Sequence, residues 1–248
     1  MGIDGGNEIM MIGLVPFKRS LIYELLSHAF SEPSREFIGF VQDGDFYNQI
    51  SDNSSLVPHL KTLDTSLVKE ASMIAKLEGF DYIRSQFRAL SSPQINYFYE
   101  CNYHSRFSAF EEMADIAGFY KAFMLDFSME RPDYLSYELE FMRCLTLMEA
   151  KALFNNEDKN VEVTASAQAK FLDSHLGRWF GLIAQHLSGS NYYKYLSDFT
   201  NAFIAAECGY LNVSPQKIDF MPQDRSISMD EDTFCPLSGT LSGSAHSL

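Results

Sequence analysis

The chain has 248 residues, 46% of them hydrophobic and 14% aromatic, a content that can fill a core and that excludes a disordered protein. Thirty-three acidic residues against nineteen basic residues give a formal net charge of −14. This charge repels phosphate and anionic lipid, so nucleic acid is not an expected ligand, and cationic partners are favoured. The alternative explanation of the negative charge is that the excess carboxylates only keep the protein soluble.

Hydrophobic residues recur at three- and four-residue intervals along most of the chain, and no segment alternates as a β-strand does. We expect turns where Gly, Pro or polar residues break this pattern, and an interruption at Gly79 within one long helix. The pattern predicts helices over residues 16–30, 34–41, 66–90, 111–127, 133–154, 165–187 and 192–210.

A single all-α domain, a helical bundle over residues 16–215, is the simplest arrangement of these helices. Residues 1–15 are expected to be a flexible N-terminus. Residues 216–248 have too few apolar residues to order themselves, so we expect a largely disordered tail. The polar stretch 155–164 is a candidate hinge, through which the last helices could exchange with a second copy to form a domain-swapped homodimer.

The four cysteines have no CxxC or CxxH spacing, which argues against a zinc ribbon or a thioredoxin-like site and favours reduced thiols. Apolar runs all fall short of the roughly 20 residues that span a bilayer. The start of the chain lacks the basic segment and apolar core of a signal peptide. We therefore expect a cytoplasmic protein without stable membrane insertion.

His175 and Trp179 lie one turn apart in a predicted helix, but no HExxH spacing accompanies them. His175 is therefore expected to be a core or capping histidine. The chain has no Gly-rich phosphate loop before a helix and no nucleophile elbow. We predict no enzymatic activity, no metal and no cofactor.

Residues 130–145, ERPDYLSYELEFMRCL, join an acidic turn to an amphipathic helix. Pro132 fixes its own φ and disfavours helical geometry at Arg131, so a new helix should begin close to Asp133. Asp133 and Ser136 are then placed to cap its first turn, although the same carboxylate also suits a binding role. The apolar side of this helix is expected to anchor the turn to the core through Leu139, Phe141, Met142 and Leu145.

The order and spacing of residues 130–142, ERPDYLSYELEFM, resemble the signature E-x-P-D-H-(hydrophobic)-(small)-x-E-L-x-F-M of the TorD/DmsD/NarJ-like chaperones, which mature redox enzymes. Residues 21–38 are similar to the first helix and turn of that family. Residues 97–123 are similar to its aromatic loop and following helix, and residues 171–187 to its late H-L-x-x-W helix. Together these stretches cover most of residues 20–210.

The resemblance implies an all-helical cytoplasmic chaperone of the TorD-like type. It would bind the twin-arginine signal peptide, the body, or both, of a molybdopterin oxidoreductase apoprotein before export or assembly, without turning over substrate. A competing hypothesis is a carrier that delivers a nucleotide or a molybdenum cofactor through the same cleft. A structural subunit that stays with its partner is a third.

A twin-arginine leader presents two adjacent guanidinium groups and then an apolar stretch, so its receptor needs carboxylates beside an aromatic or aliphatic groove. Aromatic residues precede the turn, and carboxylates cluster around it at Asp126, Glu130, Asp133 and Glu138. If arginines of the chain itself pair with these carboxylates in the free protein, direct recognition of the leader arginines is weakened. The candidates for such pairing are Arg84, Arg88 and Arg106.

Pro132 and Asp133 match the Pro-Asp of the family signature, which in relatives contributes to the signal-peptide surface. Tyr134 stands where the family usually has histidine, and although it cannot titrate near neutral pH, it can stack and donate a hydrogen bond. The resemblance also implies that Phe87 matches a position that lines the groove in the family, and that Tyr99, Glu100 and Tyr103 lie in the matching aromatic loop. The predicted peptide site is Pro132, Asp133, Tyr134, Glu138, Phe87, Tyr99, Glu100 and Tyr103.

Overall fold

The fold comes from a computed structural model, which describes residues 5–93, 96–125, 131–187 and 191–219. Nine α-helices and two short 3₁₀ helices make up most of these residues, and no β-strand occurs among them. The prediction of an all-α fold is confirmed. The helices are α1 (Gly5–Ala29), α2 (Arg35–Gln42), α3 (Asp45–Leu56), η1 (Pro58–Leu60), α4 (Ser66–Leu90), η2 (Glu100–Tyr103), α5 (Arg106–Ala122), α6 (Leu135–Phe154), α7 (Asp158–Ser174), α8 (Leu176–His186) and α9 (Asn191–Tyr210).

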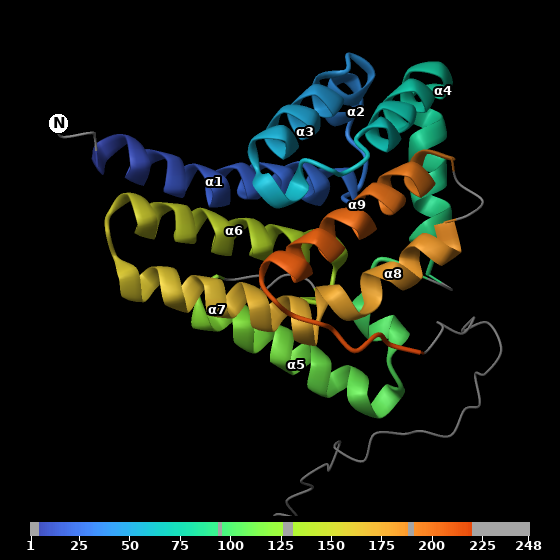
Figure 1. The fold of residues 1–248 in the computed structure, drawn as a ribbon. Coiled ribbons are helices and arrows are strands. Elements are labelled where there is room, and N and C mark those ends of the chain that lie inside the picture. The colour runs from blue at the N-terminus through green and yellow to red at the C-terminus, as the bar shows by residue number, and fades with distance from the viewer. Residues whose placement is uncertain (1–4, 94–95, 126–130, 188–190, 220–248) are drawn as a thin grey trace, which may run out of the picture.

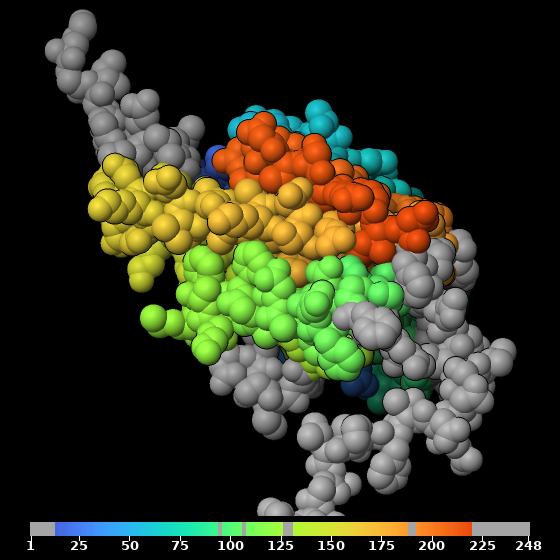
Figure 2. Space-filling model, turned by 90° about the horizontal axis from the view of Figure 1, so that it is seen from below, coloured from blue at the N-terminus to red at the C-terminus, as the bar shows by residue number. Residues whose placement is uncertain are grey.

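Helices α1, α6 and α7 lie side by side in a row, and α5 runs beside α7 (Figure 1). Helix α3 packs on α1, while α2 packs against both α3 and α4. Helix α9 packs against α4 and α8 and closes the bundle. Seen from below, α5 in green and α7 in gold share one face of the molecule (Figure 2).

One hydrophobic core lies between these helices. Helix α6 contributes Leu135, Leu139 and Met142, whose spacing by four and three residues places them on one helix face, and all three are 0% exposed. Phe141 and Leu145 are also fully buried. The prediction that the apolar side of this helix anchors the preceding turn to the core is therefore confirmed.

Several helix boundaries differ from the prediction. Helix α1 begins at Gly5 rather than at Pro16, which lies inside the helix. Helix α3 was not predicted, because its sequence is mostly polar and its buried apolar residues are only Phe46 and Ile50. The helix predicted over residues 165–187 is two helices, α7 and α8, because His175 has φ −129° and ψ −101° between them.

The connection between α6 and α7 is shorter than the candidate hinge. Residues 158–164 form the first turns of α7, so the prediction of a break over all of 155–164 is wrong. Asn156, with φ 56°, adopts the left-handed conformation that commonly ends a helix. A domain-swapped homodimer through residues 155–157 stays a prediction.

Gly79 interrupts α4 as predicted. Its φ of 83° and ψ of 177° lie in a region that is essentially restricted to glycine. Because a residue with a side chain is strained there, glycine at this position permits the kink.

The chain beyond α9 packs back on α8. The backbone N–H of Ile218 donates to the Arg178 carbonyl at 3.2 Å, and Lys217 Nζ donates to the Gly177 carbonyl at 2.6 Å. The packed part therefore extends past the expected boundary at residue 215. The predicted disorder of residues 220–248 lies outside the described residues, as do residues 1–4. None of the described helices is long and apolar enough to cross a membrane.

Candidate functional site

Residues 131–134, here called the corner, lie against the segment that leads into η2. Tyr134 and Tyr99 form an isolated antiparallel bridge. The backbone N–H of Glu100 donates to the Asp133 carbonyl at 3.0 Å. These backbone contacts bring together predicted site residues from two distant parts of the chain: Pro132, Asp133, Tyr134, Tyr99 and Glu100.

Asp133 is fully buried, and its carboxylate is already paired. It accepts hydrogen bonds from the backbone N–H of Cys101 at 3.1 Å and from Nε of Arg131 at 2.9 Å. The guanidinium of Arg131 also lies over the Tyr99 ring, 4.2 Å from its centroid. The Asp133 carboxylate, which was predicted to face a ligand, is therefore paired with Arg131 of the chain itself.

The prediction that Asp133 and Ser136 cap the helix after the corner is wrong. Tyr134 is the N-cap residue of α6, and its side chain makes no capping hydrogen bond. The physical reason is the bridge between Tyr134 and Tyr99, beside which the Asp133 carboxylate accepts the Cys101 N–H of η2.

The other charged residues considered for the corner are only partly described. Asp126 and Glu130 lie outside the described residues. Arg84 forms an ion pair with Glu32 at 3.9 Å. The side chain of Arg106 is not among those described.

The accessible part of the corner is aromatic. Pro132, Tyr134 and Tyr99 are partly exposed. The Tyr134 hydroxyl donates to the Phe30 carbonyl at 3.2 Å, and its ring lies 5.2 Å from that of Tyr99 and 5.4 Å from that of Tyr137 between centroids. Tyr134 thus ties the corner to the end of α1.

The remaining predicted site residues are buried: Tyr103, Glu100 and Glu138 are 0% exposed, and Phe87 is 6% exposed. The Phe87 ring stacks on that of Phe98 with centroids 5.3 Å apart. These side chains support the corner from the core, and none of them presents a ligand surface in this conformation.

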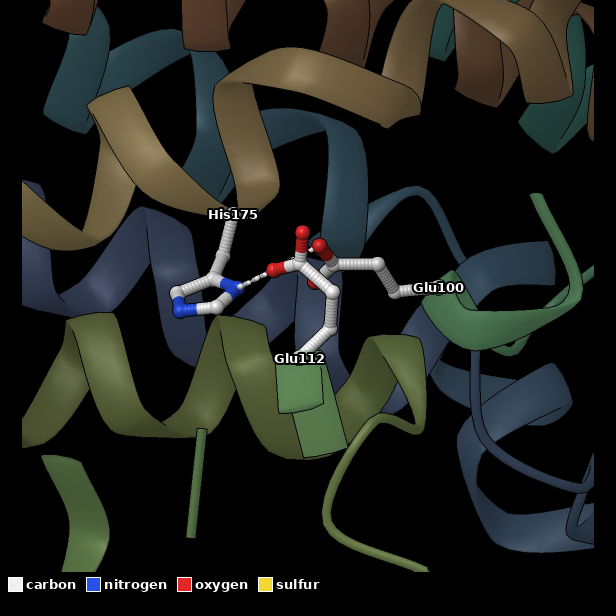
Figure 3. Close-up of side chains that lie close together, drawn as sticks. All are labelled: Glu100, Glu112 and His175. Atoms are coloured by element: carbon white, nitrogen blue, oxygen red, sulfur yellow. Dashed lines mark hydrogen bonds and ion pairs between the residues drawn. The ribbon is translucent and has the colours of Figure 1, made fainter. Parts of the chain in front are cut away.

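Three side chains from distant elements meet in the core and point toward one another (Figure 3). They are Glu100, Glu112 and His175, here called the Glu–His cluster. His175 Nδ1 lies 3.2 Å from Glu100 Oε1 and 3.7 Å from Glu112 Oε2. Its other ring nitrogen, Nε2, lies 3.1 Å from Asp115 Oδ2. His175 is fully buried, which confirms the prediction of a core histidine.

Burial and local charges shift the pKa values around this cluster in opposite directions. Burial favours the neutral ring, but the hydrogen bond and charge of Glu100 and those of Asp115 raise the pKa of His175. Burial opposes ionisation of Glu100, but the nearby rings of His104 and His175 lower its pKa. Burial and the Glu100 charge raise the pKa of Glu138. The two buried carboxyl groups therefore differ, because the pKa of Glu100 is lowered and that of Glu138 is raised.

Sequence reasoning missed His104, Glu112 and Asp115. The one available signal was the spacing of Glu112 and Asp115, which places both on one helix face. Their partner His175 lies 60 positions beyond Asp115, and no pattern in the sequence connects the two.

A cavity of about 510 Å³, here called the groove, lies between α1, α2 and α3. Apolar and aromatic side chains alternate in it with carboxylates. The last turns of α1 line the groove and also contact the start of α6, since Ser27 Oγ donates to the Ser136 carbonyl at 2.9 Å. The lining residues, none of which was predicted as a site, are Leu21, Glu24, Leu25, His28, Ser34, Glu36, Phe37, Phe40 and Gln49.

A second cavity, of about 480 Å³, lies beside the Glu–His cluster and is here called the acidic cavity. Carboxylates dominate its lining, and one guanidinium accompanies them. The lining residues are Glu112, Asp115, Asp173, Ser174, Arg178, Ser214 and Gln216.

A family model described as nitrate reductase delta subunit matches residues 96–185. The matched segment contains the corner and the Glu–His cluster and ends within α8, whereas the groove lies before it. No curated protein matches the chain.

Proposed function

We propose that the chain binds an apoprotein of a molybdenum-cofactor oxidoreductase in the cytoplasm, because its residues 96–185 match the model of the nitrate reductase delta subunit, a family within the TorD/DmsD/NarJ redox-enzyme maturation chaperones. This is a family of chaperones for molybdoenzymes and not of catalytic enzymes. The bound element is the leader of the client, its body, or both, and binding precedes export or assembly.

The groove is the observation that carries leader binding. Phe37 and Phe40 are partly exposed in it, and Glu24 and Glu36 stand beside them with accessible carboxylates. Neither glutamate is in an ion pair within the described part of the chain. A leader with adjacent arginines and an apolar stretch matches this combination, since guanidinium groups bind carboxylates and apolar side chains bind aromatic walls.

The corner has a different part in this proposal. Its carboxylate, Asp133, is buried and paired with Arg131, so it cannot accept a client arginine without displacing a residue of the chain itself. The rings of Tyr99 and Tyr134 are partly exposed, and their accessible parts are apolar. We assign Pro132, Tyr99 and Tyr134 to contact with the client, and Asp133, Glu138, Phe87, Glu100 and Tyr103 to support of that surface.

The charge of the cavities favours the peptide over the competing carrier function. The acidic cavity presents Glu112, Asp115 and Asp173 against Arg178 alone, and the groove presents Glu24 and Glu36. Carboxylates repel the phosphates of a nucleotide or of a molybdenum cofactor. Native mass spectrometry of freshly isolated protein distinguishes the two functions, because a carrier retains its cofactor.

Calorimetric titration with a synthetic leader, which has two adjacent arginines and an apolar segment, tests the proposal. The full chain should bind it at low salt, and Glu24→Gln with Glu36→Gln should weaken binding by about tenfold, because two charge-assisted contacts are lost. The matched control is Glu70→Gln with Glu78→Gln, two exposed carboxylates on α4, which should change little. Equal binding by both double variants would remove the groove from the proposal. If neither a leader nor a client apoprotein binds the unaltered chain, the chaperone function itself is wrong.

A further inference from the structure

The Glu–His cluster has the donor atoms and the spacing of a metal site. Its three members come from η2, from α5 and from the residue between α7 and α8, and one ligand atom of each lies within 4.8 Å of the others. A divalent cation bound by nitrogen and oxygen at about 2.0–2.2 Å keeps tetrahedral ligands about 3.3–3.6 Å apart. The Nδ1 atom of His175 is 3.2 Å from Glu100 Oε1 and 3.7 Å from Glu112 Oε2, so a cation would require only small shifts.

A further histidine, His104, lies beside the cluster, and one of its ring nitrogens lacks a hydrogen-bond partner in the described part of the chain. The side chain of His104 is 5% exposed, and its Nε2 has no hydrogen-bond partner among the described residues, although it faces Glu100 Oε1 at 3.5 Å. Its Nδ1 is 3.5 Å from Glu112 Oε1. A buried ring nitrogen without a hydrogen bond is costly, and imidazole is a preferred ligand of zinc and related metals.

The surroundings orient these ligands as in known metal sites. Asp115 Oδ2 lies 3.1 Å from His175 Nε2, and a carboxylate on the second ring nitrogen fixes the tautomer of a ligating histidine. Arg178 Nη1 donates to Glu112 Oε1 at 3.2 Å, which leaves Oε2 of the same carboxylate directed at His175. The acidic cavity, which Glu112 and Asp115 also line, gives a cation a negatively charged route to the cluster.

We infer that Glu100, Glu112 and His175, with His104 beside them, form a binding site for a divalent first-row transition metal of the Zn²⁺ class. The bound ion would connect η2, which holds the corner, to α5 and to the junction of α7 and α8. The inference does not depend on the proposed function, because it concerns only the donor set in the core.

Equilibrium dialysis of the chelator-stripped full chain against Zn²⁺, followed by elemental analysis, tests the inference. One Zn²⁺ should bind per chain, and Glu112→Gln and His175→Gln should each weaken binding by at least about tenfold, because losing a metal ligand costs no less than losing one of its supporting contacts. His28→Gln, which removes an exposed histidine in the groove, is the matched control and should bind as the unaltered chain does. Zn²⁺ should also raise the melting temperature of the unaltered chain and not that of Glu112→Gln.

The Co²⁺-substituted protein separates this site from the cysteines, because a thiolate ligand gives a charge-transfer band that nitrogen and oxygen ligands do not. If His175→Gln fails to fold, Glu112→Gln decides, because its side chain is 19% exposed and glutamine keeps its shape. Absence of Zn²⁺ binding, unchanged binding by Glu112→Gln, or a thiolate band would each overturn the inference. In those cases hydrogen bonds and ion pairs alone hold the Glu–His cluster together.

Discussion

At the scale of single residues, the corner is closed by its own arginine. Arg131 bonds the buried Asp133 carboxylate and stacks on Tyr99, so one side chain satisfies a charge and covers an aromatic ring. The Cys101 N–H bonds the same carboxylate from η2. Asp133 therefore holds two chain segments together. Its residue type predicts a structural role as a helix cap, whereas its observed structural role is this link between the corner and η2.

Replacement of Asp133 by asparagine should destabilise the fold by about 1–3 kcal/mol, because hydrogen bonds to a charged acceptor are lost and an amide donor faces the Arg131 donors. Urea unfolding measures the change in free energy. Asp81→Asn is the matched control, since the Arg35–Asp81 pair is 3.8 Å long and its side chains are 76% and 86% exposed. It should change stability by less than about 0.5 kcal/mol. Equal effects of the two substitutions would contradict the structural role of Asp133.

At the scale of elements, the break between α7 and α8 places His175 in the core. Gly177 follows the break, and its position is tightly enclosed. A Cβ atom there would meet the Leu172 carbonyl oxygen, and it would lie 2.7 Å from Pro215 Cγ. The close approach of α8 to the end of α7 thus requires the absence of a side chain at this residue.

Gly177→Ala should therefore destabilise the protein by about 1–3 kcal/mol through overpacking against a backbone oxygen that cannot move away. The matched control is Gly118→Ala in α5, where a Cβ meets nothing within 4 Å. That substitution should stabilise the protein by about 0.5–1 kcal/mol, because alanine loses less conformational freedom in a helix. Thermal unfolding of both variants gives the comparison, and a Gly177→Ala protein as stable as the unaltered chain would refute the close approach.

Periodicity predicted those elements whose apolar residues are dense, such as α6, in which Leu135, Leu139 and Met142 share a face. It failed for α3, because two of the residues that α3 buries, Asn53 and Ser54, are polar and carry no hydrophobic signal. The corner could be predicted because its motif is local in the sequence. The Glu–His cluster could not, because the pairing of residues up to 75 positions apart depends on how the helices pack.

At the scale of the whole molecule, one buried ionic network joins helices from both ends of the chain. Arg19 of α1 donates to Glu207 of α9 at 2.7 Å, to Glu149 of α6 at 3.1 Å and to Gln168 of α7 at 2.7 Å. His59 of η1 reaches Glu207 Oε1 at 2.8 Å. Arg19 and Glu207 are 0% exposed, so loss of either partner leaves a buried charge without its counterpart.

Ionised Glu207 should stabilise the fold, and this stabilisation should be lost in acid. Burial opposes ionisation of this carboxyl group, but the charge of Arg19 and the hydrogen bonds from His59 and Arg19 outweigh it and lower its pKa from 4.5 to about 2. Because the folded pKa is the lower one, this stabilisation is complete above about pH 4.5 and is lost as the pH falls toward about 2. The loss should be on the order of 3 kcal/mol.

Comparison of the unaltered chain with Glu207→Gln isolates this contribution, since other carboxylates titrate in both. At about pH 7 the variant should be less stable by roughly 3–5 kcal/mol, because Arg19 remains buried without its main partner. The difference should shrink as the pH falls, since protonated Glu207 and glutamine carry the same charge. Asp198→Asn, which removes the more exposed Lys194 pair, should leave the acid dependence unchanged. Parallel curves for Glu207→Gln and the unaltered chain would mean that the buried network is not what acid disrupts.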